Sequence, residues 1–126
     1  MQIVAVGIFV LVNRALLVKR AQNDGILWAF PGGKVHEYEN PEDAVVREFF
    51  EETGIKTSVR EFIGERTHPF SKKFIKYYRL DYVGGRIKTP NTTEILEIDF
   101  FDFATARKLL GNEIFSPIKK IIKSQK

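Results

Sequence analysis

The sequence contains no cysteine, which excludes disulfide bonds, thiol nucleophiles and thiolate zinc sites. It also has no long hydrophobic run. The longest apolar stretch, residues 3–12, has about half of the roughly 20 residues that a membrane-spanning helix needs. Because this stretch lacks a basic leader and is followed by Asn13 and Arg14, we interpret it as a buried strand rather than a signal peptide. These absences favour a soluble, cytoplasmic protein that does not enter a membrane.

Length and composition predict one domain, residues 1–126. The 126 residues leave no room for a second core of comparable size. An apolar content of 44% and an aromatic content of 13% are typical of a globular protein. The net charge of +4 suits an anionic ligand, but it is weak evidence for nucleic-acid binding.

Apolar periodicity and turn residues predict a mixed α/β domain with helices on both faces of a sheet. Residues 21–40 are rich in Gly, Asn, Asp and Pro and are expected to form a long functional loop. The expected strands cover residues 2–12, 15–19, 57–64, 73–83 and 95–103, the first two forming a hairpin around Asn13-Arg14. The expected helices cover residues 41–53, residues 104 to 110, and a segment that Ser116 caps and Pro117 opens.

The helix at residues 41–53 is the clearest of these elements. Asn40 is suited to cap it, and Gly54 can end it in a left-handed conformation. The i, i+3, i+4, i+7 spacing predicts a buried apolar stripe that consists of Val46, Phe49, Phe50 and Thr53.

Three glutamates, Glu48, Glu51 and Glu52, lie opposite this stripe at i, i+3, i+4 spacing. Like charges at this spacing repel one another by about 0.2–0.5 kcal/mol per pair. Arg47 can pair with one of the carboxylates, but it cannot neutralise three. The residues alone leave two interpretations open: a solvated acidic helix face, or a site for a hard divalent cation such as Mg²⁺.

The preceding loop favours the metal site. Residues 30–34, Phe-Pro-Gly-Gly-Lys, supply glycines that let the backbone approach a ligand closely, and Glu39 adds a fourth carboxylate. Such a loop before an acidic helix cradles phosphate poorly on its own. It makes physical sense if metal ions bridge the carboxylates and the phosphates.

The spacing of these residues resembles a known family. Gly33, Glu39 and the run Arg47-Glu48-Phe49-Phe50-Glu51-Glu52-Thr53-Gly54-Ile55 are similar to the full signature of the Nudix hydrolases, G-x5-E-x7-R-E-U-x-E-E-x-G-U, with U a bulky apolar residue. The resemblance implies an α/β/α sandwich with a mixed β-sheet between helices. It also implies a Mg²⁺-dependent enzyme, with Mn²⁺ as a substitute ion, that cleaves a phosphoanhydride bond in a small-molecule nucleotide.

Carried over by position, the resemblance implies that Glu48, Glu51 and Glu52 bind the metal together with the Gly32 carbonyl. Arg47 would orient a glutamate through a charge-assisted hydrogen bond.

The resemblance gives four further residues a supporting role. Glu39 would bind the metal through water or support its ligands, unless it forms only a loop salt bridge. Gly33 and Gly54 would shape the backbone. Lys34 is equally suited to touch a phosphate or to stay solvated.

The resemblance leaves the general base open, because some family members use a glutamate of the signature and others one from a later loop. The later candidates here are Glu94 and Glu97, and a structural role for either stays open. We prefer Glu94 because it lies closer to the loop of residues 89–93.

Candidate substrate contacts lie outside the signature. Arg20 is suited to pair with phosphate oxygens. Phe70, Tyr77 and Tyr78 could line a base pocket, although each of them also fits a core position. His68 is placed for substrate contact, against a purely structural role.

Two features of the sequence favour different substrate classes. Pro69 lies at an offset from Gly54 that resembles ADP-ribose-cleaving family members, whereas a chain that starts directly with its first sheet strand is more similar to MutT-like enzymes. We therefore expect a (d)NTP diphosphatase, a monomer or homodimer without nucleic-acid or membrane partners. The alternatives are an ADP-ribose, nucleotide-sugar or dinucleotide pyrophosphatase, a silent nucleotide- or RNA-binding domain, and a basic nucleic-acid-binding protein.

Overall fold

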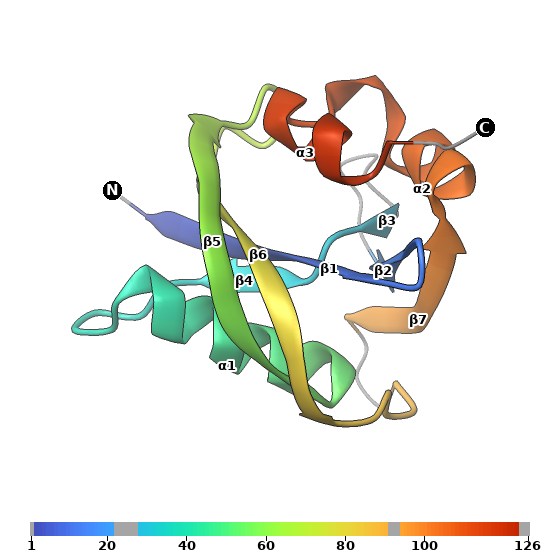
Figure 1. Cartoon of the computed structure of the whole chain (residues 1–126). Helices are drawn as coiled ribbons and strands as arrows, with labels where there is room; N and C mark the ends of the chain where they lie inside the picture. Colours follow the sequence, from blue (N-terminus) through green and yellow to red (C-terminus); the bar gives the residue numbers. More distant parts are fainter. Residues whose placement is uncertain (1, 22–27, 91–93, 124–126) are drawn as a thin grey trace.

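The computed structural model describes residues 2–21, 28–90 and 94–123 (Figure 1). The segments 22–27 and 91–93, where parts of the predicted loops fall, lie outside the described residues. The strands are β1 (Ile3–Leu11), β2 (Arg14–Arg20), β3 (Trp28–Ala29), β4 (Gly32–Lys34), β5 (Ile55–Thr67), β6 (Phe74–Gly85) and β7 (Ile95–Asp102). The helices are α1 (Pro41–Thr53), α2 (Phe103–Leu110), the 3₁₀ turn η1 (Gly111–Glu113) and α3 (Ser116–Ile121).

The sheet is built around β1 and has the order β3-β2-β1-β6-β5, with β4 paired to β1 and β7 paired to β2. The β1–β6 pair is parallel, whereas the pairs of β1 with β2 and with β4 are antiparallel. The sheet is therefore mixed, as expected.

Helices cover both faces of this sheet: α1 lies on one side and α2 with α3 on the other (Figure 1). Strand β2 shows why, because consecutive residues of it are fully buried on opposite faces. Leu16 and Val18 pack in the core under α1, and Ala15 and Leu17 pack in the core under α2 and α3. Within the described chain, no helix is long and apolar enough to cross a bilayer.

Helix α1 has the predicted bounds because local signals set both ends. The Asn40 side chain accepts a hydrogen bond from the Asp43 N–H (2.8 Å), and Pro41 opens the first turn. Gly54 adopts φ 85°, and its N–H donates to the Phe50 carbonyl (2.8 Å). A Cβ at Gly54 would lie 2.6 Å from the Arg86 carbonyl oxygen, so glycine is required there.

The predicted buried stripe of α1 is partly wrong. Phe49 and Thr53 are buried, but Phe50 is 44% exposed and Val46 is only half-buried. Ala44 and Val45 are fully buried in their place. The helix therefore presents a smaller-residue face to the sheet, rotated from the one that side-chain bulk suggested.

Three other local predictions need correction. The hairpin turn consists of Val12 and Asn13, which have positive φ of 52° and 59°, and Arg14 already belongs to β2. The predicted loop 21–40 contains the short strands β3 and β4, because both pair with the long central strands. Ser116 makes no side-chain cap, and the residue before α3 is Phe115.

Candidate active site

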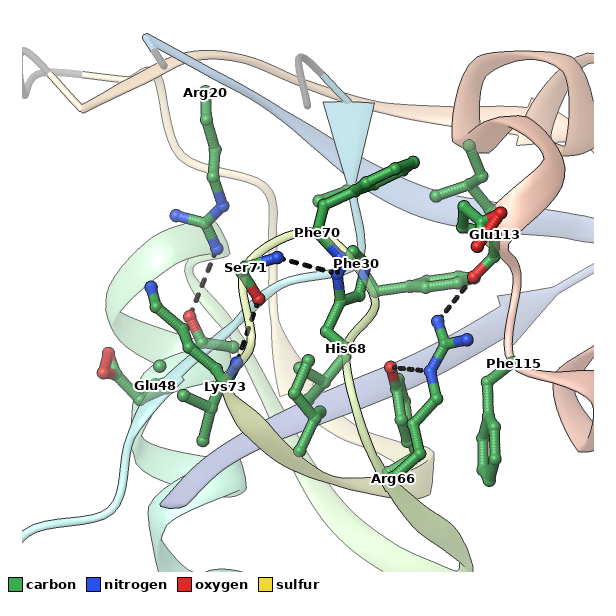
Figure 2. Close-up of a pocket in the computed structure, with 18 of the residues that line it drawn as sticks. Arg20, Phe30, Glu48, Arg66, His68, Phe70, Ser71, Lys73, Glu113 and Phe115 are labelled. Atoms are coloured by element: carbon green, nitrogen blue, oxygen red, sulfur yellow. Dashed lines mark hydrogen bonds between the residues drawn. The ribbon is translucent and has the colours of Figure 1, made fainter. Parts of the chain in front are cut away.

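A cavity of about 550 Å³ lies over one face of the sheet (Figure 2). Strand register defines its floor: Val4 pairs with Lys34 on one side and with Ile75 on the other, and Ile75 pairs with Arg66. All four residues line the cavity. Three interstrand spacings separate Lys34 from Arg66, or about 14 Å. The floor is thus apolar in the middle with a cation at each end.

The end near Arg66 is aromatic. The ring of Tyr77 stacks on Phe115 with centroids 4.8 Å apart and an interplanar angle of 21°. Arg66 donates to the Tyr77 hydroxyl (3.2 Å) and to the Glu113 carbonyl, and its guanidinium lies 5.4 Å from the Phe115 ring centroid (Figure 2). Burial raises the pKa of Tyr77, so its hydroxyl stays protonated at neutral pH. This end combines aromatic side chains with a few fixed polar groups, which is a common lining of small-molecule pockets.

The other end holds carboxylates from α1. Glu52 accepts hydrogen bonds from Arg20 (3.0 Å) and from the Gly32 N–H (3.2 Å). Burial raises the pKa of Glu52, and the Arg20 charge opposes that rise. Arg20 also donates to the Gly32 carbonyl (3.2 Å). The residue predicted as a phosphate contact is therefore bonded to a predicted metal ligand.

Glu48 lies beside Glu52 against the backbone of β4. Burial raises its pKa to about 7, repulsion from Glu52 adds to the rise, and Arg47 (3.8 Å) opposes it. A Cβ at Gly33 would lie 1.9 Å from Oε2 of Glu48. The carboxylate of Glu48 can therefore occupy its position only because residue 33 is a glycine.

Arg47 binds the carboxylates of Glu39 and Glu51, neither of which lines the 550 Å³ cavity. Its Nε donates to Oε2 of Glu39 (2.8 Å) and its Nη1 to Oε1 of Glu51 (3.2 Å). Its Nη2 reaches Oε1 of Glu39 (2.9 Å) and the Lys34 carbonyl (3.1 Å). The Arg47 hydrogen bonds hold the pKa of Glu39 at about 2, helped by the His36 N–H, and Glu39 in turn raises the pKa of Arg47.

The residues present fit a hard divalent cation. Glu48 and Glu52 are two desolvated carboxylates whose charges repel, and a cation would relieve that repulsion. The Gly32 carbonyl retains a second lone pair beside its bond to Arg20. The described residues contain no group of three His, Asp or Glu side chains already arranged to hold a metal ion, and Glu51 is 55% exposed and pairs with Arg47 (3.2 Å). Mg²⁺ needs only one or two carboxylates, with waters and substrate phosphates completing its ligands.

The two later glutamates lie in different places. Glu94 lines the cavity and also a smaller one of about 180 Å³, and Glu48 and Glu52 line both as well. The charge of Glu94 contributes to the raised pKa of Glu52. Glu97 pairs with Lys19 across β2 and β7 (3.3 Å) and is absent from both linings. The structure therefore puts Glu94, and not Glu97, beside the carboxylates.

The NUDIX domain family model matches residues 1–121 of this chain. The chain belongs to this family. A curated relative named ADP-ribose pyrophosphatase, from Methanocaldococcus jannaschii, is 38% identical over 106 residues, which cover 77% of this chain and 59% of that protein. The CTP pyrophosphohydrolase of Escherichia coli is 40% identical over 65 residues, which cover 50% of this chain and 48% of that protein. The chain thus spans about half to three fifths of the length of these relatives.

The fold of this Nudix domain is similar to that of solved structures. A NUDIX hydrolase from Nitrosomonas europaea superposes with a TM-score of 0.74, covering 97% of this chain and 70% of that chain at 20% identity. The predicted α/β/α sandwich with a mixed sheet is confirmed.

The Nudix domain brings together most of the residues that the sequence singled out. The cavity is lined by Arg20, Gly32, Gly33, Lys34, Glu48, Glu52, His68, Phe70, Tyr77 and Glu94. Glu51 pairs with Arg47 and lines the smaller cavity together with Glu48, Glu52 and Glu94. Glu39 is held by Arg47, and Tyr78 is buried in the core under α1.

Sequence reasoning missed Arg66, Lys73 and Phe115, which also line the cavity. Arg66 was missed because the predicted strand ended at residue 64, whereas β5 continues to Thr67 and pairs Arg66 with Ile75. Phe115 had no signal in the sequence, because its role depends on how the segment before α3 folds back over β5 and β6.

Proposed function

We propose that this Nudix domain is a Mg²⁺-dependent pyrophosphohydrolase that cleaves a nucleoside diphosphate linked to another moiety. The observation that carries the proposal is one cavity with desolvated carboxylates at one end and an aromatic surface at the other. The distance between the ends, about 14 Å, accommodates a nucleoside with its first phosphates.

The metal would be held by Glu48 and Glu52 with the Gly32 carbonyl, and Glu51 would join once it leaves Arg47. When bound, the ion neutralises phosphate charge and lowers the pKa of a water that can attack phosphorus. Arg20 holds Glu52 and Gly32 in place through its two hydrogen bonds. These contacts keep the carboxylate oxygens directed at the cavity.

Proton transfer falls to Glu94 in this proposal. A general base must lie within hydrogen-bond reach of the attacking water, and Glu94 borders the same space as Glu48 and Glu52. Glu97 is engaged with Lys19. Lys34, at the end of β4, faces the same cavity and would contact a phosphate oxygen.

Two classes of substrate compete. The sequence favours (d)NTPs, which the E. coli relative's name also suggests, but that relative aligns with 50% of this chain. The M. jannaschii relative named ADP-ribose pyrophosphatase aligns with 77%. The broader match supports ADP-ribose as the first compound to compare with the (d)NTPs.

A product-resolved panel tests the proposal. Purified protein with Mg²⁺ is offered (d)NTPs, oxidised guanine nucleotides, ADP-ribose, NADH and dinucleoside polyphosphates, and products are separated by ion-exchange chromatography. We expect cleavage at a phosphoanhydride bond that stops when the metal is chelated. Saturable nucleotide binding without cleavage of any compound would instead identify a silent binding domain.

A further inference from the structure

The turn between β5 and β6 is held in one shape by the His68 side chain. Its Nδ1 accepts hydrogen bonds from the backbone N–H groups of Phe70 (3.1 Å) and Ser71 (3.3 Å). At the neck of the turn, the His68 N–H donates to the Lys73 carbonyl (2.8 Å), and the Lys72 N–H donates to the His68 carbonyl (2.9 Å). A ring nitrogen that accepts N–H groups carries no proton, so this geometry requires the Nε2–H tautomer.

Four residues of this turn line the cavity, namely His68, Phe70, Ser71 and Lys73, and two of them are exposed. Phe70 is 62% exposed and Lys73 is exposed, and both line the space that holds Glu48 and Glu52 (Figure 2). The ring next to Phe70 is the His68 imidazole, 5.8 Å away. Lys72 is also exposed but lies outside the cavity lining. Neighbouring lysines thus differ in whether they face the proposed substrate.

The two arginines that line the cavity are already bonded to other groups of the protein. Arg20 is bonded to Glu52 and to the Gly32 carbonyl, and Arg66 to the Tyr77 hydroxyl and the Glu113 carbonyl. Among the described residues, this leaves the two lysines of the lining as the cations best placed to meet an anionic group that enters.

We propose that this turn is a preformed substrate-binding element, in which Lys73 contacts a phosphate, Phe70 stacks on a ring of the nucleotide, and His68 is a positioning residue for both. The proposal rests on the proposed pyrophosphohydrolase function. From the sequence, His68 was expected to contact the substrate directly, whereas here His68 supports the turn. Lys73 is a further substrate contact that the sequence did not predict.

The chemistry of the turn defines its ligand class. A lysine binds phosphate as a point charge, and an aromatic ring adds a flat apolar contact to a base. Because His68 fixes the turn before the ligand arrives, binding costs less conformational entropy. The turn therefore suits a ligand that carries a ring and a phosphate together.

Matched variants test the proposal. Lys73→Met removes the charge that faces the cavity, and Lys72→Met removes the adjacent charge that does not. His68→Ala removes the acceptor of the turn, and His68→Asn restores an acceptor oxygen near the Nδ1 position. For each protein, kcat and KM are measured with Mg²⁺, and Kd is measured for the α,β-methylene analogues of ATP and of ADP-ribose.

We expect Lys73→Met and His68→Ala to raise KM and Kd about ten-fold, the effect of losing one hydrogen bond to a charged group. Their kcat should stay within about two-fold, since the contact is made before the chemical step. His68→Asn should recover most of the loss, and Lys72→Met should match the wild type. The double variant His68→Ala/Lys73→Met should lose less than the product of the single effects, because both act through one contact.

Equal KM and Kd for Lys73→Met and Lys72→Met would overturn the proposal, as would His68→Asn no better than His68→Ala. If the wild type binds the analogues, the variants show the expected order of Kd values, and no protein cleaves any compound, the proposed function is wrong and this inference stands. If the wild type cleaves a substrate but the variants do not show the expected order of KM and Kd values, this inference is wrong and the proposed function stands. A wild-type protein that binds neither analogue would overturn both.

Discussion

The variant Gly33→Ala should move the carboxylate of Glu48 without destabilising the fold, so it tests whether the position of this carboxylate matters for turnover. The new Cβ would lie 1.9 Å from Oε2 and 2.3 Å from Cδ of Glu48. Ordinary contact begins near 3.4 Å, so the carboxylate has to retreat by roughly 1.5 Å. It is the far end of a flexible side chain, so the retreat costs little folding free energy.

A carboxylate displaced by this much leaves the position from which it would bind the ion. A misplacement of about 1 Å can reduce turnover about 10²-fold, and we expect a reduction of that size in kcat for Gly33→Ala. The free energy of unfolding should change by less than about 1 kcal/mol, because alanine also restricts the unfolded chain. Gly84→Ala is the matched control, since its Cβ would meet no atom within 4 Å.

The assay combines Mg²⁺-dependent hydrolysis with urea denaturation of both variants. Gly33→Ala should lose turnover with a normal denaturation midpoint, and Gly84→Ala should keep both. Full turnover in Gly33→Ala would refute the role given to the position of Glu48. A large loss of stability would show that the backbone, and not the carboxylate, gives way.

Two further predictions concern the acidic residues around the site. Glu39→Gln should lower the free energy of unfolding by about 1–2 kcal/mol at neutral pH, since the Arg47 contact is partly exposed. Because the folded pKa of Glu39 is lowered from 4.5 to about 2, this difference is fully present above the unfolded value and disappears as the pH falls through about 2. Urea denaturation across acidic pH checks it, and a difference that does not depend on pH would contradict the pairing. Glu94→Gln should reduce kcat about 10²- to 10⁴-fold, as loss of a general base does, while Glu97→Gln stays near wild type. Equal kcat losses in the two variants would remove Glu94 from the role of base.

The sequence predicted what depends on neighbours along the chain. The bounds of α1 followed from Asn40, Pro41 and Gly54, each acting within its own turn. Arg47 was expected to pair with one of the carboxylates, and it donates to Glu51, its i+4 neighbour. The family signature is local for the same reason, so the fold class and the carboxylate end of the cavity could be anticipated.

Contacts across long sequence separations could not be anticipated in the same way. The Arg20–Glu52 pair joins residues 32 apart, and the Arg66–Glu113 bond joins residues 47 apart. Their partners are decided by strand register and by the path of the segment before α3. The burial of Ala44 in place of Phe50 has a similar cause, because the face of a helix that packs depends on the sheet it meets.

The rate of phosphoanhydride cleavage, titrated with Mg²⁺ in the wild type and in Glu52→Gln, tests the central claim most directly. We expect a wild-type rate that rises from zero with Mg²⁺ and saturates. In Glu52→Gln the rate should be lower by about 10²-fold or more at every Mg²⁺ concentration, with the fold retained. Wild-type cleavage that persists without any divalent ion, or an unchanged rate in the variant, would contradict this claim.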